Sequence, residues 1–446
     1  MHTTAPTPLP GPDGRHVRNT IMRIRDTLGL FQWLHRQYGG IVGYNVLHLK
    51  FCAIFDPELI HEVLVQQRTS FEKGFLYRRA SVIGRLTTGE GAEHRKFRTA
   101  VQPFFHRKML DSYVNIMVAQ TIEIRDTWCD GQIVEAQQAM YNVFYSIADT
   151  VFFGNRLPLN LKMATDVDDL MALDFQLALL PARAMLKQVL PRYRRLRNVK
   201  DQIDKLIYTE IHDARADMGK RTDLVAFLIR AADAQGSPAF DDLDVLEIVL
   251  EMMIGSHTTS GTALAWLFYY LSQNPSVRTR LEQEVDTVLG NRRAILEDYE
   301  RLRYTRAVVD EALRLGTPAY FIGRTAKEAC RIGGYLLPAG THVQLCGYMS
   351  HRDTRYFPNP NQFCPARWLQ PQSERPKYAY MPFGAGHRSC VGEEFARMGM
   401  AYAVASITQR WRFEMVSDRP PAVNTLVAYI PKHGIPMTMV ERHRSA

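Results

Sequence analysis

Phe383-Gly384-Ala385-Gly386-His387-Arg388-Ser389-Cys390-Val391-Gly392 sets one cysteine in a glycine-rich turn, behind a phenylalanine and beside an arginine. Glycines at 386 and 392 allow backbone conformations and close approaches that a Cβ atom would block. The residues after Cys390 have a helical pattern, so we expect the sulfur to lie near a helix N-terminus, which lowers the pKa of a thiol. The stretch therefore predicts a single thiolate that is presented, dry and oriented, to a metal centre.

The composition is that of an ordinary globular protein with an ample core. The 446 residues are 46% hydrophobic and 23% charged, and no internal repeat is present. The six cysteines form no Cys-x-x-Cys pair, which favours a reducing, cytoplasmic location. The proline-rich N-terminus lacks the apolar stretch of a signal peptide, and the apolar segment 245–271 is interrupted by Glu247 and Glu251. We expect no membrane span.

The net charge of +9 raises the question of an anionic partner. No zinc-finger or RNA-binding signature accompanies the basic residues, so nucleic acid is not expected. An anionic surface or an acidic protein partner remains as the explanation of the net positive charge.

Periodicity predicts a mainly helical chain with a small sheet region, an α+β fold. Helices are expected at 211–232, 244–272 and 304–315, and short strands at 41–46, 51–55 and within 331–340. No linker separates two compositions. We therefore predict one domain over residues 1–446, with residues 1–20 as a flexible tail.

The cysteine turn matches Phe-x-x-Gly-x-Arg-x-Cys-x-Gly, and the chain thereby resembles the cytochrome P450 superfamily of haem-thiolate monooxygenases. Glu311-Ala-Leu-Arg314 resembles the Glu-x-x-Arg motif of that family, in which the two charges share a helix face. The segment 363–368 resembles the one that adds a third charge, here Arg367. Ala366 and Trp368 stand where the family usually has glutamate and phenylalanine. The resemblance implies a structural ion network.

The resemblance also implies haem b, held between the long central helix and the helix after the cysteine loop. Cys390 would be the axial ligand of the iron, and a thiolate there favours O–O cleavage. The residues implied to contact the haem are His94, Arg98, Arg324, Phe383, Arg388, Cys390 and Gly392, of which His94, Arg98, Arg324 and Arg388 would bind the propionates.

A polar run, residues 255–261, interrupts the long apolar helix, so a function there is expected. In the family this stretch receives dioxygen, and an acid–alcohol pair delivers protons to it. Gly255, Thr258 and Thr259 match the family pattern, whereas His257 replaces the acid. Two interpretations stay open: His257 relays protons itself, or it only bonds a neighbouring helix while Thr258 and water deliver them.

Substrate-facing positions are predicted from their place relative to the motifs. They are mostly apolar, which suits a bulky hydrophobic substrate. The segment 75–86 is expected to form a lid. The predicted pocket residues are Ile254, Pro318, Ala319, Tyr320, Phe321, Val427 and Ala428.

The implied activity is insertion of one oxygen atom from O2 into a hydrophobic small molecule, in secondary metabolism. A terpenoid is favoured over a polyketide or a fatty acid. Electrons would come from NAD(P)H through a ferredoxin (or flavodoxin) and its reductase to a monomeric enzyme, and Lys96, Arg107, Lys108 and Arg397 are candidate contacts. Two alternatives are a peroxide-dependent haem-thiolate enzyme and a non-catalytic haem sensor.

Overall fold

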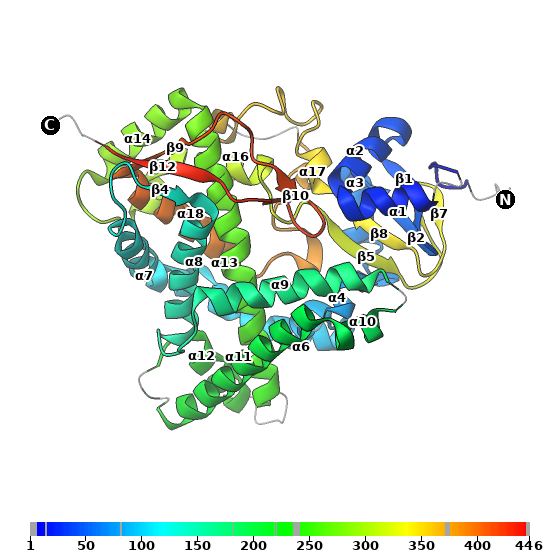
Figure 1. Ribbon diagram of the computed structural model, residues 1–446, viewed down its shortest axis with the longest axis horizontal. Coiled ribbons are helices and arrows are strands. Elements are labelled where there is room, and N and C mark those ends of the chain that lie inside the picture. The colour runs from blue at the N-terminus through cyan, green and yellow to red at the C-terminus, as the bar shows by residue number, and fades with distance from the viewer. Residues whose placement is uncertain are drawn as a thin grey trace.

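The long helix α13 (Asp242–Gln273) runs through the centre of the molecule, and other helices pack around it (Figure 1). The computed structural model describes residues 7–13, 16–80, 83–180, 182–217, 219, 221–234, 241–370 and 375–442. Asp241 caps α13 by accepting from the Asp244 amide at 2.8 Å, while the Asp244 carboxylate accepts from the Asp241 amide at 3.3 Å. This reciprocal capping fixes where the helix starts.

The helices around α13 build one large apolar core. The long helices α8 and α18 each bury most of their length in this core. The helices are α1 His16–Arg25, α2 Thr27–Tyr38, α3 Pro57–His61, α4 Phe75–Arg79, α5 Arg85–Thr88, α6 Gly91–Val101, α7 Arg107–Arg125, α8 Ala136–Phe153, α9 Leu161–Ala178, α10 Arg183–Val189, α11 Pro191–Ala216, α12 Leu224–Ala234, α13 Asp242–Gln273, α14 Pro275–Leu289, α15 Asp298–Arg301, α16 Arg303–Leu315, α17 Gly347–Ser350 and α18 Glu393–Thr408.

Small sheets lie away from this helical core. A five-stranded sheet of order β1-β2-β8-β5-β3 forms one end of the molecule, and β2 and β8 are its one parallel pair in the described chain. A three-stranded sheet, β4-β12-β9, lies at the other end (Figure 1). The strands are β1 Ile41–Val46, β2 Leu49–Ile54, β3 Phe71–Lys73, β4 Ile133–Glu135, β5 Ile322–Ala326, β6 Cys330–Ile332, β7 Tyr335–Leu337, β8 His342–Leu345, β9 Trp411–Met415, β10 Val423–Asn424, β11 Ile430–Pro431 and β12 Pro436–Glu441.

The mainly helical fold with a small sheet region is therefore confirmed. The predicted helices at 244–272 and 304–315 correspond to α13 and α16, and the early hairpin is β1–β2. Among the described residues, none of the helices combines the length and the apolar character that a membrane crossing needs.

The expectation of one helix over 211–232 is wrong. Helix α11 ends at Ala216 and α12 begins at Leu224. Asp223 accepts from the Ala226 amide at 3.0 Å, so it caps α12. Buried Arg221 binds Asp223 at 2.9 Å and also binds Glu210 of α11. The apolar period ran on through this break, but the aspartate cap and its ion pair start a new helix.

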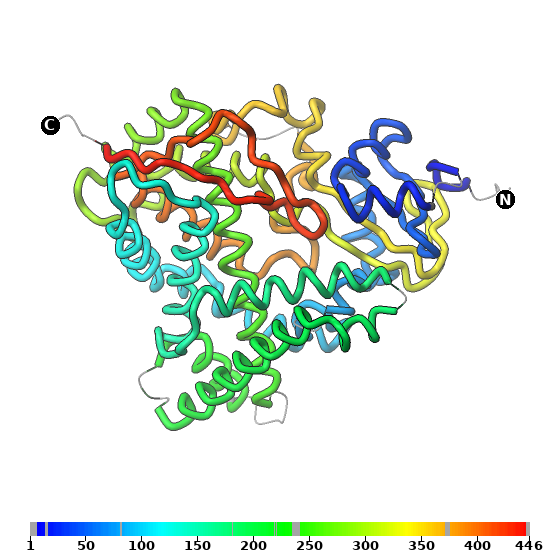
Figure 2. Tube along the Cα trace, in the orientation of Figure 1, coloured from blue at the N-terminus to red at the C-terminus, as the bar shows by residue number. Residues whose placement is uncertain are grey.

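The N-terminal residues also differ from the expected flexible tail. The Pro10 carbonyl accepts from the Gly43 amide of β1 at 2.8 Å, and helix α1 already begins at His16. Residues 1–6 and 14–15 of the expected tail lie outside the described residues. The tube in Figure 2 shows the first and last described segments on opposite sides of the molecule, while the C-terminal hairpin loop, residues 425–429 between β10 and β11, returns toward the N-terminal helices.

Candidate active site

Cys390 lies in the loop just before α18, as the sequence predicted. Its amide donates to the Phe383 carbonyl at 2.9 Å, which closes the loop. Gly386 has a φ of +73°, and a Cβ atom there would lie 2.7 Å from the Leu64 carbonyl oxygen. Glycine is therefore required at 386 by both conformation and space. Gly392 has an ordinary φ of −92° and no close neighbour, so the structure gives no such requirement there.

The Cys390 thiol is enclosed by protein, although small molecules can reach it. Its pKa is raised by burial, against the opposing effects of the Gly392 amide and Arg98. The expectation of a lowered pKa was wrong, because desolvation of the sulfur outweighs the nearby helix start.

Two of the predicted cationic groups already have protein partners. Arg388 pairs with Glu90 at 2.7 Å and donates to the Thr87 carbonyl at 3.1 Å. Arg98 donates to the Ser389 carbonyl at 2.6 Å, beside Cys390. Both side chains therefore hold the cysteine loop against the segment 87–98.

Arg324 and Lys73 are different, because neither forms an ion pair with a carboxylate within the described residues. Arg324 of β5 is 6% exposed and donates only to its neighbour, the Gly323 carbonyl, at 2.8 Å. Burial and Arg388 lower the pKa of Arg324 to about 10. Burial, Arg324 and Arg388 lower the pKa of Lys73, on the paired strand β3, to about 7.

His94 completes this cationic region. It is buried on α6, and burial followed by Arg388 lowers its pKa to about 4. Its ring meets His387 of the cysteine loop edge-on at 5.8 Å. A neutral imidazole beside several guanidinium groups can donate a hydrogen bond without adding a further positive charge.

These residues fit a haem. Buried cations that repel one another without a counter-charge are unfavourable unless an anion joins them. A flat apolar group that carries two carboxylates supplies that charge, and the enclosed Cys390 thiol supplies the ligand for its metal. In the middle of α13, Gly255 and Thr259 are exposed one helical turn apart, and an added Cβ atom at 255 would meet nothing within 4 Å. The helix thus leaves room for such a group.

The polar run of α13 is held by specific hydrogen bonds. The Thr259 hydroxyl, which is exposed, donates to the Gly255 carbonyl at 2.6 Å. His257 is fully buried, and its Nδ1 lies 2.8 Å from the Met253 carbonyl. Thr258 is half-buried, and its hydroxyl points instead to helix α9.

On α9 the partner is Asp168, which no sequence pattern had singled out. Its Oδ2 lies 3.0 Å from His257 Nε2 and also accepts from the Thr258 hydroxyl. Burial acts to lower the pKa of His257, but the Asp168 carboxylate and the Met253 carbonyl outweigh it and raise the pKa. His257 therefore does bond a neighbouring helix, and through a carboxylate.

A small apolar cavity lies beside Arg324, between the five-stranded sheet, α4 and the C-terminal hairpin. Phe321 and Val427, predicted pocket residues, line it, and so do three residues of the expected lid, Phe75, Leu76 and Tyr77. Positions 81–82 of that lid lie outside the described residues. The lining is Phe51, Gly74, Phe75, Leu76, Tyr77, Phe175, Phe321, Gly323, Arg324, His342, Val343, Gln344, Leu426 and Val427.

The other predicted pocket residues do not line this cavity. Tyr320 is fully buried in the N-terminal core, where its hydroxyl donates to the Thr425 carbonyl. Pro318 is buried and accepts from the Tyr429 amide at 2.9 Å, whereas Ala319 is exposed. Ala428 is half-buried, and Ile254 is buried on α13. Side-chain direction in an irregular segment cannot be read from sequence position alone.

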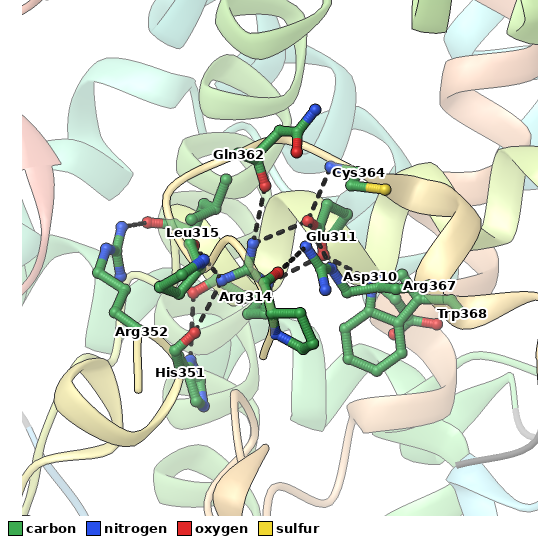
Figure 3. A network of polar contacts seen from close by, with 12 residues as sticks. Asp310, Glu311, Arg314, Leu315, His351, Arg352, Gln362, Cys364, Arg367 and Trp368 are labelled. Atoms are coloured by element: carbon green, nitrogen blue, oxygen red, sulfur yellow. Dashed lines mark hydrogen bonds and ion pairs between the residues drawn. The ribbon is translucent and has the colours of Figure 1, made fainter. Parts of the chain in front are cut away.

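The predicted ion network is brought together around one buried carboxylate, that of Glu311 on α16 (Figure 3). Arg314 binds both carboxylate oxygens, at 2.7 and 2.9 Å, and Arg367 binds one at 3.1 Å. The Trp368 indole and the Cys364 amide donate to Glu311 at 2.8 and 2.9 Å. Trp368, a departure from the family pattern, thus adds a donor that phenylalanine lacks.

Arg314 also fixes the loop that follows α17. It donates to the carbonyls of His351 at 2.7 Å, Pro360 at 2.6 Å and Gln362 at 3.1 Å (Figure 3). Burial of Glu311 opposes its ionisation, but Arg314 outweighs this and lowers the pKa of the carboxyl. The network is therefore fully ionised and fully hydrogen-bonded.

The predicted docking cations differ in how far they are engaged. Lys96 binds Asp244 at 2.8 Å, and Arg397 binds Asp310 and, at 3.0 Å, Glu393. Arg107 is exposed and pairs with Asp111 at 2.9 Å. Lys108 is exposed without an ion pair among the described residues. Of the four, Lys108 is the cation that another protein can most readily use.

Comparisons with known proteins identify the family of the chain. A family model described as Cytochrome P450 matches residues 10–436. Cyclooctatin synthase of Streptomyces melanosporofaciens is 30% identical over 368 residues, which is 81% of this chain and 80% of the relative. Cyclooctat-9-en-7-ol 5-monooxygenase of the same organism is 29% identical over 371 residues, 81% and 79% of the two chains. Pentalenene oxygenase of Streptomyces avermitilis is 30% identical over 389 residues, 83% and 84%.

Proposed function

The chain belongs to the cytochrome P450 family, and on that premise we propose that it inserts one oxygen atom from O2 into a bulky, polycyclic terpenoid in secondary metabolism. The protein is an oxidoreductase, a P450 monooxygenase. The observation that carries the substrate class is the similarity to relatives that are named for cyclooctatin, cyclooctat-9-en-7-ol and pentalenene. The small apolar cavity beside Arg324 adds aromatic and aliphatic side chains that suit the edge of such a substrate.

Haem b is the cofactor that the family implies, and when bound it supplies the activation of dioxygen. The Cys390 sulfur would hold its iron. Arg324, Arg388, His94 and Arg98 would hold its carboxylates, because Arg324 is buried without a carboxylate partner among the described residues and Arg388 lies near both Arg324 and His94. Gly255 and Thr259 keep the facing side of α13 open, and the apolar lining excludes water from the substrate.

The named relatives support a terpenoid rather than a polyketide or a fatty acid. Their names concern cyclooctatin, cyclooctat-9-en-7-ol and pentalenene, which are polycyclic terpenoids. At about 30% identity these relatives indicate a class of substrate and not one compound.

Electrons would come from NAD(P)H through a ferredoxin or flavodoxin and its reductase, to a monomeric enzyme in the cytoplasm. The net charge of +9 suits an acidic partner, and Lys108 and Arg107 offer exposed cations near the cysteine-loop helix. Charge reversal at Lys108 should therefore slow reduction most at low ionic strength.

Two measurements test the proposal. The reduced carbon monoxide adduct should show the red-shifted Soret band of thiolate ligation, and Cys390→Ala should lose it. Pentalenene and cyclooctat-9-en-7-ol, added as probes, should shift the resting Soret band and give products heavier by one oxygen atom in the presence of O2, NAD(P)H and a surrogate ferredoxin system. Palmitic acid is the matched probe from another class.

The outcomes separate the candidates. Turnover of palmitic acid with no response to either terpenoid would contradict the proposed substrate class. Product formation with hydrogen peroxide but not with reduced ferredoxin would support the peroxide-dependent alternative. Haem binding without oxidation of any probe, under conditions where electrons reach the iron, would support a sensor.

A further inference from the structure

The carboxylate that position 257 lacks is supplied by another helix. Asp168 lies on α9, which packs against α13, and it is 89 residues from His257 in sequence. One oxygen, Oδ2, lies 3.0 Å from His257 Nε2 and accepts the hydroxyl hydrogen of Thr258. Asp168 therefore touches both members of the polar run that the sequence had linked to proton delivery.

The hydrogen bonds of His257 fix how many protons the cluster holds. Nδ1 lies 2.8 Å from the Met253 carbonyl, which can only accept, so Nδ1 carries a hydrogen. The 3.0 Å contact between Nε2 and Asp168 Oδ2 then needs one further proton, on one atom or the other. The His257–Asp168 pair thus stores one exchangeable proton, one hydrogen bond away from the Thr258 hydroxyl.

No other described charge competes for this proton. The rings that face His257 from α8 are Tyr141 and Tyr145, each edge-on at 6.2 Å. Burial raises the pKa of both phenols, so they stay neutral. On α9 and α13 the group within hydrogen-bond reach is Asp168.

The second oxygen of Asp168 has no use within the cluster. Oδ1 is buried and has no hydrogen-bond partner, although the side chain as a whole is 15% exposed. A buried carboxylate oxygen without a partner is unfavourable, and an observed one calls for an explanation. It can accept a proton or a water molecule that arrives from the exposed edge.

We propose that Asp168 is a positioning and proton-storing residue that acts through Thr258. The Thr258 hydroxyl, which donates to Asp168 Oδ2 in the structure, turns its hydrogen toward the site. As Thr258 gives up that proton, its Oγ takes the proton from Asp168 Oδ2, which has received it from His257 Nε2. The pair then regains a proton at Oδ1 from water. N–H and O–H bonds alone change, and no electrons are transferred. The inference rests on the proposed monooxygenase function.

The first test reads the stored proton directly. In the ferrous carbon monoxide form, with histidine labelled at 13Cε1, the His257 resonance is identified by its loss in His257→Gln. We expect the pKa read from this resonance to lie above 6.5 in the unchanged protein. In Asp168→Asn the histidine should be at least tenfold less basic. Asp168→Glu, which keeps the carboxylate, should restore most of the shift.

Asp169→Asn is the matched control, because Asp169 is the next residue, is 52% exposed and pairs with Arg192. Its His257 titration should match that of the unchanged protein. Equal titration in Asp168→Asn and Asp169→Asn would overturn the proposal. So would a His257 titration below 6.5 in the unchanged protein, a result that needs no variant to fold.

The second test reads the pathway, with cyclooctat-9-en-7-ol as probe substrate. Asp168→Asn should raise hydrogen peroxide per NAD(P)H several-fold, toward the level of Thr258→Ala, and the double variant should be no worse than Thr258→Ala alone. Two outcomes would overturn the relay. In the first, the double variant shows the product of the two single-variant effects on hydrogen peroxide; in the second, Asp168→Asn leaves coupling unchanged. Absence of product from every variant and from the unchanged protein would instead count against the proposed substrate, and the histidine titration would still decide the inference.

Discussion

Two buried polar regions use similar residues and treat charge in opposite ways. In the region around Glu311, Arg314 donates through two of its nitrogens to the Glu311 carboxylate and also donates to three backbone carbonyls. Beside the apolar cavity, Arg324 is almost as buried but donates only to the neighbouring Gly323 carbonyl. The first region is complete within the protein, and the second needs an anion from outside. Completeness of hydrogen bonding thus separates a structural network from a binding site.

Two buried histidines, His351 beside the Glu311 network and His257 between α13 and α9, make a related contrast. In His351, Nδ1 lies 3.2 Å from the Arg314 carbonyl and Nε2 accepts from the Met381 amide at 3.0 Å. Burial, Arg352 and Arg314 lower its pKa to about 3. His257 also faces a carbonyl with Nδ1, but its Nε2 faces Asp168, and its pKa is raised. The partner of one nitrogen decides the charge.

Removing the charge at the centre of the complete region should have the largest effect. Glu311→Gln leaves Arg314 and Arg367 buried without a counter-charge, which costs about 3–5 kcal/mol of unfolding free energy. Urea titration at constant pH measures it. Glu300→Gln breaks an ion pair with Arg306 that is 67% exposed on the glutamate side and should cost less than about 1 kcal/mol. Equal losses in the two variants would erase the contrast.

Removing a cation from the incomplete region should weaken haem binding and not the fold. Arg324→Gln takes away one charged hydrogen-bonding group for the haem carboxylates, worth about 1.5–3 kcal/mol, or roughly tenfold to a hundredfold in affinity. Haem transfer to apomyoglobin measures the loss. The haem-free variant should be at least as stable as the parent, because a buried unpaired cation is gone. Arg331→Gln, on the exposed β6, serves as control.

The two histidines should respond to pH with opposite signs. His351 is neutral in the folded protein, whereas in the unfolded chain it takes up a proton near pH 6.5. Its contribution to stability is therefore full above pH 6.5 and is lost as the pH falls toward about 3. Between pH 7 and pH 5 the loss is about 2 kcal/mol. His257, with a raised pKa, contributes fully below 6.5 and loses its contribution as pH rises through the folded pKa.

Urea titrations of His351→Gln and His257→Gln across pH 5–9 check these signs. The first variant should lose less stability than the unchanged protein on acidification, and the second should lose less on alkalinisation. The same sign in both variants would show that the two environments do not differ as described.

The smallest free-energy effect is expected at Thr258, where a single hydroxyl is removed. Thr258→Ala should divert electrons from product to hydrogen peroxide by about tenfold, because the hydroxyl passes on the proton. The ratio of product to NAD(P)H consumed measures it. Ser272→Ala is the matched control on the same helix, since that hydroxyl donates to the Tyr269 carbonyl and accepts from the Gln273 side chain, both at the end of α13. Unchanged coupling in Thr258→Ala would remove Thr258 from the relay.

Residues that act through a local motif could be predicted from the sequence. Glu311 and Arg314 share a helix face three residues apart, and the Cys390 turn carries its glycines and arginine within ten residues. The long helix α13 also followed from its apolar period and from the proline after it. Arg367 was found because the segment around it resembles a family segment.

Residues brought in by tertiary packing could not be predicted. Asp168 stands near Asp166 and Asp169, and nothing local says which of the three faces α13. Lys73 joins Arg324 only because β3 pairs with β5. Trp368 departs from the family pattern, and nothing local shows that its indole donates to Glu311. Each of these depends on which face of an element meets a distant one.

The C-terminal hairpin loop carries a consequence for engineering. Leu426 and Val427 line the cavity, yet Arg23 near the end of α1 donates to the Leu426 carbonyl at 3.4 Å across 403 positions of sequence. Thr425 also donates to Asp26, the N-cap of α2, at 3.4 Å. A mutant library confined to residues that touch the substrate would therefore miss positions that influence substrate selectivity by placing the loop. Randomising positions 23 and 26 offers a way to reshape the cavity from outside it.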